Sequence, residues 1–262
     1  MDALYDDYRT LQACALVYQG WLYPARKNLF HTVVLDSEAR ARRLRVLIAE
    51  SIILANYIQV LHFDTHNHYM RRIGTVDLQS WVMQFLPFFA RTLRFVNTLH
   101  FDYIQWNTLR GFNIHSMSIL SEFGSVESLH LRGCKFGTFE SFERVVLTLS
   151  RNVKDLTLCG LTWEKPDCLK EGYHLPLLHL RVISGCSLNH IYRWLAKTRV
   201  GLPTGTLRNL EFGEVHDEAD LMNVGKILRE IGPHLHTLKI GCDFPWRSCT
   251  DIQGRSLYKP HD

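Results

Sequence analysis

A short leucine-centred pattern recurs along the chain and constrains its fold more than any other feature of the sequence. The pattern is an apolar residue, two unrestricted residues, a leucine, one unrestricted residue and a second apolar residue. The central leucines are spaced by 24 to 38 residues, and a spacing of roughly 20–29 residues is typical of leucine-rich repeats. The leucines of the seven copies are Leu61, Leu99, Leu129, Leu156, Leu180, Leu210 and Leu238.

The segments between the leucine motifs carry helical patterns. Apolar residues from Phe139 to Leu149 fall at three- and four-residue spacing, which predicts an amphipathic helix. The stretch from Asp220 to Ile231 has the same spacing, and Gly232-Pro233 should end that helix. Ser80 to Leu86 also predicts a helix, which Pro87 should kink or end.

These two patterns together predict the fold. The motif leucine and the residue two positions later point to the same side of a strand, toward the core. A strand, a helix and a parallel strand form the unit of a solenoid. We therefore predict an α/β leucine-rich-repeat solenoid, a horseshoe with a parallel concave sheet and convex helices. A doubly wound sheet or a βα barrel also alternates strands and helices, but neither has a reason to repeat one leucine-anchored strand motif.

Composition and charge restrict the class of partner. Hydrophobic residues make up 46% of the chain and charged residues 21%, as in ordinary globular proteins. The net charge is only +4, and the densest basic stretch, Arg40 to Arg45, is expected to be the solvated face of a helix, so we predict no nucleic-acid partner. The apolar stretches are too short to span a bilayer, so we predict no membrane partner. Scattered cysteines without a Cys-x-x-Cys pair indicate a reducing compartment, and we expect an intracellular protein, cytoplasmic or nuclear.

One histidine-rich string is the main enzyme-like signal. His66 and His68 form a His-x-His pair after a predicted strand, which resembles the motif with which amidohydrolase barrels hold a water-activating metal. The two positions match Ile104 and Trp106 of the next repeat, which favours a strand-exit turn. No Gly-x-Ser-x-Gly elbow or phosphate-binding glycine loop occurs. We predict no catalytic residues, no metal and no cofactor, with a metal-dependent amidohydrolase-like enzyme as the outside alternative.

The N-terminal segment differs from the repeats and carries a family resemblance. Its order of residues is Leu11, Cys14, Leu16, Val17 and Trp21, then Arg26 and Leu29-Phe30, then a short strand at Val33 and Leu35. This order resembles the second half of an F-box. With the leucine motifs that follow, the chain is similar to the F-box and leucine-rich-repeat proteins of mushroom-forming fungi. A complete F-box opens with a Leu-Pro pair and a first helix, so a chain that starts at Met1-Asp2-Ala3-Leu4 is expected to carry an N-terminally truncated F-box.

The resemblance implies a function and a domain division. In that family the F-box docks on a Skp-type adaptor, and the repeats bind the protein to be ubiquitinated. It implies that Leu16, Val17 and Trp21 bind the adaptor in an SCF-type ubiquitin ligase and that the repeats bind a protein substrate, whose identity is open. The same residues also suit a cap over the end of a solenoid, in a free-standing repeat scaffold without a ubiquitin role. The predicted domains are a partial F-box-like segment (1–36), a leucine-rich-repeat domain (37–245) and a loosely ordered tail (246–262).

Two columns of polar residues are predicted on the concave face. They lie at the outward positions of successive strands, and the first column begins with the histidines of three strands. Adjacent strands are about 4.8 Å apart, so the three imidazole rings should stack. Like-charge repulsion should lower the pKa of the middle one, and the third, which has no aspartate beside it, should be the hardest to protonate. The columns are either a recognition patch, whose binding would change near mild acid, or a solvated ladder of side chains. Their residues are His62, His100 and His130, then Asp64, Asp102 and Arg132.

Overall fold

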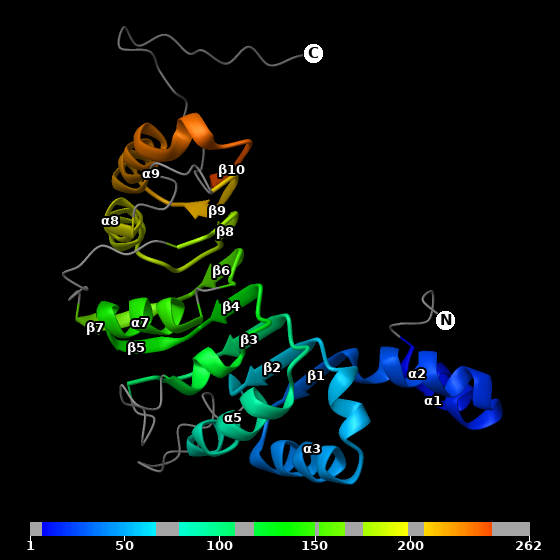
Figure 1. Ribbon diagram of the computed structural model, residues 1–262. Helices are drawn as coiled ribbons and strands as arrows, with labels where there is room; N and C mark the ends of the chain where they lie inside the picture. The colour runs from blue at the N-terminus through cyan, green and yellow to red at the C-terminus, as the bar shows by residue number, and fades with distance from the viewer. Residues whose placement is uncertain are drawn as a thin grey trace, which may run out of the picture.

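A computed structural model describes residues 7–66, 79–107, 118–149, 152–165, 175–198 and 207–242. Its centre is an eight-stranded sheet in which every strand pairs in parallel with its neighbours. The strands follow one another in chain order, and Figure 1 shows them along a curved path. They are β1 (Thr32–Leu35), β2 (Val60–Asp64), β3 (Thr98–Asp102), β4 (Ser128–Arg132), β6 (Asp155–Cys159), β8 (His179–Val182), β9 (Asn209–Val215) and β10 (Thr237–Cys242).

The helices that follow β1 lie along the outer side of this curved sheet (Figure 1). The α-helices are α1 (Tyr8–Val17), α2 (Gln19–His31), α3 (Glu38–Glu50), α5 (Ser80–Thr92), α7 (Phe139–Leu149), α8 (Leu188–Thr198) and α9 (Glu218–Ile231). The 3-10 helices within the described residues are η2 (Ile52–Asn56), η3 (Ser118–Glu122) and η4 (Gly232–His234). A second, two-stranded parallel sheet consists of β5 (Lys135–Thr138) and β7 (Thr162–Lys165). Within the described residues, no helix is long and apolar enough to cross a membrane.

The leucine motifs align the sheet. Leu61 of β2 is in register with Leu99 of β3, and each later motif leucine is in register with the next. Six of these leucines are fully buried, and they form the floor of one continuous core under the helices. The prediction that all seven are buried is wrong for Leu238, which is 41% exposed. It lies on β10, the last strand of the sheet, where no further described strand covers its outer side.

The predicted helices are present, with one difference. The predicted stretches correspond to α7 and α9, and α9 ends at Ile231 before the 3-10 helix η4. Of the two outcomes expected at Pro87, a kink or an end, the end does not occur, because α5 continues through Pro87 to Thr92. The missing N–H of a proline inside a helix costs about 3 kcal/mol. The buried side chains on one face of α5, from Trp81 to Phe89, offset that cost by packing against the sheet.

The two ends of the chain were predicted to differ from the repeat domain. The short strand expected at Val33 and Leu35 is β1, and it pairs with β2 as the first strand of the same sheet. The helices α1 and α2 precede it and project away from the sheet in Figure 1. The segment 246–262, predicted to be a loosely ordered tail, lies outside the described residues.

Candidate functional site

The face of the eight-stranded sheet that is turned away from the helices, here called the open face, carries columns of polar side chains. They arise because alternate residues of a strand point to opposite sides, and the parallel register places equivalent residues next to one another. The middle column, read from β2 to β10, is His62, His100, His130, Thr157, Arg181, Glu211 and Lys239. The predicted partner-binding histidines therefore lie on three adjacent strands.

The three imidazoles form the predicted stack. The ring centroids of His100 and His130 are 4.1 Å apart and their planes differ by only 5°. The ring of His62 is 5.2 Å from that of His100 and is tilted by 44°. The prediction of a histidine column is thus confirmed, and its tightest contact is between β3 and β4.

The three residues of the second predicted column have different contacts and different exposure. Asp102 is 7% exposed, and its Oδ2 lies 3.2 Å from Nε2 of His62. Asp64 instead accepts a hydrogen bond from the backbone N–H of His66 at 2.8 Å. Arg132, the register neighbour of Asp102, is exposed at the end of β4. The structure therefore brings Asp102 into the histidine cluster, whereas Asp64 supports a turn and Arg132 lies at the rim.

Burial, more than repulsion, governs protonation of the stack. Burial lowers the pKa of His100 to about 4, with smaller contributions from His130 and His62, while Asp102 raises it. The pKa of His130 is also lowered, first by burial and then by Arg181. The expectation that His130 is the hardest to protonate is wrong, because His100 is the ring enclosed between two others. Because the pKa of His100 lies near 4, its ring is neutral at mild acid, so a change in binding there would not come from His100.

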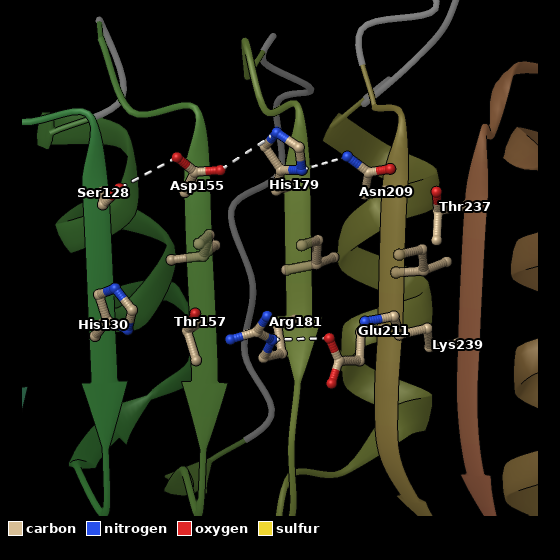
Figure 2. A pocket seen from close by; sticks show the side chains of 13 residues that line it. Ser128, His130, Asp155, Thr157, His179, Arg181, Asn209, Glu211, Thr237 and Lys239 are labelled. Atoms are coloured by element: carbon tan, nitrogen blue, oxygen red, sulfur yellow. Dashed lines mark hydrogen bonds and ion pairs between the residues drawn. The ribbon is translucent and has the colours of Figure 1, made fainter.

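A groove of about 510 Å³ occupies the C-terminal half of the open face. Figure 2 shows a chain of interactions across its upper side, from β4 to β9. The Ser128 hydroxyl donates to Asp155 at 3.2 Å, and Nε2 of His179 lies 3.6 Å from the same carboxylate. The Asn209 amide contacts Nδ1 of His179. With Asn209 donating to Nδ1, the proton of neutral His179 is on Nε2, toward Asp155.

The lower side of the groove carries charges. Arg181 donates through Nε to Glu211 at 2.9 Å, and Lys239 lies beyond them on β10 (Figure 2). The residues of the upper side were not among the predicted site residues. Each of them directly precedes a motif leucine and lies two positions before the middle-column residue of its own strand. The strand alternation that identified His130 could therefore also have identified Ser128 and Asp155.

The predicted adaptor-binding residues lie together on the N-terminal helices. Leu16 and Val17 end α1 and are strongly exposed, Leu16 at 88%. Trp21, in α2, is 46% exposed, and its ring packs edge-on against that of Tyr18 at 5.7 Å. The helices α1 and α2 project away from the sheet (Figure 1), and the high exposure of Leu16 and Val17 means that neither side chain is buried against its end. The arrangement disfavours the capping interpretation.

The metal alternative rests on a pair that the structure describes only in part. His66 lies just after β2, with its ring 4.4 Å from that of Tyr103, and His68 lies outside the described residues. Among the described residues, no group of three His, Cys, Asp or Glu side chains is placed to hold a metal ion.

The open face is chemically suited to recognition. Its polar groups are held on neighbouring strands and are hydrogen-bonded to one another, as the Ser128 hydroxyl is to the Asp155 carboxylate. No protein-family model matches this chain, and no curated protein matches it. The functional interpretation therefore rests on the geometry of the open face and of the N-terminal helices.

Proposed function

We propose that this chain is a leucine-rich-repeat solenoid that binds another protein on its open, concave face, as the substrate-recognition subunit of an SCF-type ubiquitin ligase. The fold proposal is supported by the eight parallel strands in chain order and by the register of the motif leucines. Solenoids of this kind bind partners on their concave surface, where successive repeats present equivalent side chains.

One observation carries the protein-binding proposal: the open face presents a wide, preorganised polar surface on which no described helix packs. The side chains of the groove are held in place by partners on neighbouring strands, as Arg181 is by Glu211 and Asp155 is by Ser128. Surfaces that are rigid before binding lose less conformational entropy on association. We assign the contacts of the N-terminal half of this face to the histidine stack with Asp64, Asp102 and Arg132.

The N-terminal helices support the ubiquitin-ligase part of the proposal. The helices α1 and α2, with Tyr18 between them, expose several large apolar side chains close together in the sequence: Leu16, Val17, Tyr18, Trp21 and Tyr23. Contiguous exposed apolar side chains mark interaction surfaces, and aromatic residues commonly dominate the binding energy. The resemblance of this segment to an F-box makes a Skp-type adaptor the proposed partner.

The adaptor proposal is tested by measuring binding of the purified chain to a purified fungal Skp-type adaptor, for example by biolayer interferometry. Trp21→Ala should weaken binding by about 30-fold or more, as expected for an aromatic hot spot. Phe95→Ala is the matched control, because Phe95 is also an exposed aromatic but lies in the turn before β3. Circular dichroism of each variant shows whether the sheet remains folded.

Three outcomes would contradict this proposal. Absence of binding by the unmodified chain would favour the free-standing repeat scaffold. Equal weakening by Phe95→Ala would show that the contact is non-specific. Unfolding of the sheet by Trp21→Ala would assign Trp21 to a structural cap.

A further inference from the structure

Four strands leave the main sheet through the same unusual backbone conformation. Tyr103, Gly133, Gly160 and Gly185 follow β3, β4, β6 and β8, with φ angles of 60°, 59°, 61° and 62°. The N–H of Tyr103 donates to the carbonyl of Arg132 at 2.7 Å, and the N–H of Gly133 donates in the same way to the next strand. The turns therefore stack on one another, and at the glycines they leave the rim of the sheet without side chains.

A hollow of about 370 Å³ lies on this rim, between the ends of β4 and β6 and the beginnings of β5 and β7. Gly133 and Gly160 contribute to its lining, so a ligand can approach the backbone closely there. The side chains that line it belong to Tyr103, Arg132, Lys135, Cys159, Thr162 and Ser184. The lining thus contains two cations, the aliphatic hydroxyls of Thr162 and Ser184 and the phenol of Tyr103, and no carboxylate.

The two cations are available to a ligand. Arg132 has no ion pair with any residue that the structure describes, since Asp102, its register neighbour, is engaged with His62. Lys135 lies 3.3 Å from Glu164, but both side chains are about half exposed. Ion pairs of that kind contribute little and are readily exchanged for a stronger anion.

Tyr103 supplies a second indication that this rim has a role beyond the fold. A left-handed backbone is strained for a residue with a Cβ, and three equivalent turns use glycine. The conformation directs the Tyr103 ring over Gly133, where an added Cβ would lie 2.5 Å from the ring, and against the ring of His66. Such strain is concentrated at functional sites, where the position of a side chain matters.

We propose that this rim hollow binds a phosphate monoester group. Arg132 and Lys135 neutralise the charge of the phosphate, and the hydroxyls of Thr162 and Ser184 donate to its remaining oxygens. A tetrahedral oxyanion with several acceptor oxygens matches this set of donors better than a planar carboxylate does. The site lies at the carboxyl ends of the parallel strands β4 and β6. It does not depend on protein binding by the open face.

The proposal is tested by isothermal titration calorimetry of the full chain with O-phosphoserine and, separately, with inorganic phosphate. Saturable binding is expected, and Arg132→Gln should weaken it about tenfold or more. Arg94→Gln is the matched control, because Arg94 is an exposed arginine in the turn that enters β3, at the opposite rim. Lys135→Gln should also weaken binding, whereas Lys154→Gln should not, although Lys154 is likewise paired with a glutamate.

Two sources present this group, a small phosphate ester and a phosphorylated side chain of a protein. A serine-phosphorylated peptide that binds at least about tenfold more tightly than O-phosphoserine supports the site with a protein source, and equal affinities support it with a small-molecule source. Absence of saturable binding at ligand concentrations up to about 10 mM, which is ten times a Kd of about 1 mM, overturns the proposal. Equal losses in Arg132→Gln and Arg94→Gln also overturn it, because they would show a response to net charge alone.

Discussion

Acidification should destabilise this protein through His100, the middle ring of the histidine stack. In the folded protein the pKa of His100 is lowered from its ordinary value of 6.5 to about 4, mainly by burial. The groups that face it are His62 and His130 on either side and Asp102, which favours the charged ring. Arg181 and Asp155 act on the stack from the far side of His130. The folded state therefore prefers the neutral ring over a range in which the unfolded chain is protonated.

The sign of the effect follows from this difference in proton uptake. Well above pH 6.5, His100 is neutral in both states and contributes no pH dependence. Between about pH 6.5 and 4 the unfolded state binds more protons, so the free energy of unfolding falls as the pH falls. The full difference in pKa sets an upper bound of roughly 3 kcal/mol. Because the ring is partly exposed and water screens its charge, we expect about 1–2 kcal/mol.

Urea unfolding at several pH values between 7 and 4.5 measures this loss, followed by intrinsic tryptophan fluorescence. His100→Gln removes the titrating ring and should flatten the pH dependence by about 1–2 kcal/mol. His216→Gln is the control, because His216 lies outside the stack, beside Glu214. A proton NMR titration in which His100 shows a pKa near 6.5 would refute the reasoning, as would a pH dependence that His100→Gln leaves unchanged.

Two further predictions concern the sheet and use the same unfolding assay. Leu129→Ala should lower the free energy of unfolding by about 2–5 kcal/mol, because Leu129 is fully buried. Leu238→Ala should lower it by only about 1 kcal/mol, because Leu238 is 41% exposed. Equal losses would argue against the repeat register. Gly160→Ala should cost about 1–2 kcal/mol for its left-handed backbone, since an added Cβ has room there. Gly213→Ala should cost more, because its Cβ would lie 2.5 Å from the Ile183 carbonyl oxygen; the reverse order would contradict this geometry.

The alignment of the sheet was predictable from the sequence because it follows from local rules. Side chains alternate along every strand, and the repeated leucine sets the same register in each repeat. This is why the stacking of His62, His100 and His130 followed from their places in the motif. The helices α7 and α9 followed in the same way from apolar residues at helical spacing.

Other features depended on contacts between segments that the local patterns do not contain. The continuation of α5 through Pro87 depends on packing against the sheet, and the exposure of Leu238 depends on its place on the last strand. The rim hollow joins Arg132 to Thr162 through turns that stack only after the strands have paired.

Which side chains share a column of the open face follows from the amino-acid sequence, but whether each is buried, paired or exposed depends on the tertiary contacts around it. Asp102 and Arg132 occupy equivalent positions on neighbouring strands, yet one is buried beside His62 and the other is exposed at the rim. Likewise, repulsion between neighbouring imidazoles was predictable, but burial dominates the pKa of His100. The physical reason is that direction along a strand is a property of the local backbone, whereas desolvation and charge pairing depend on every group packed around a side chain.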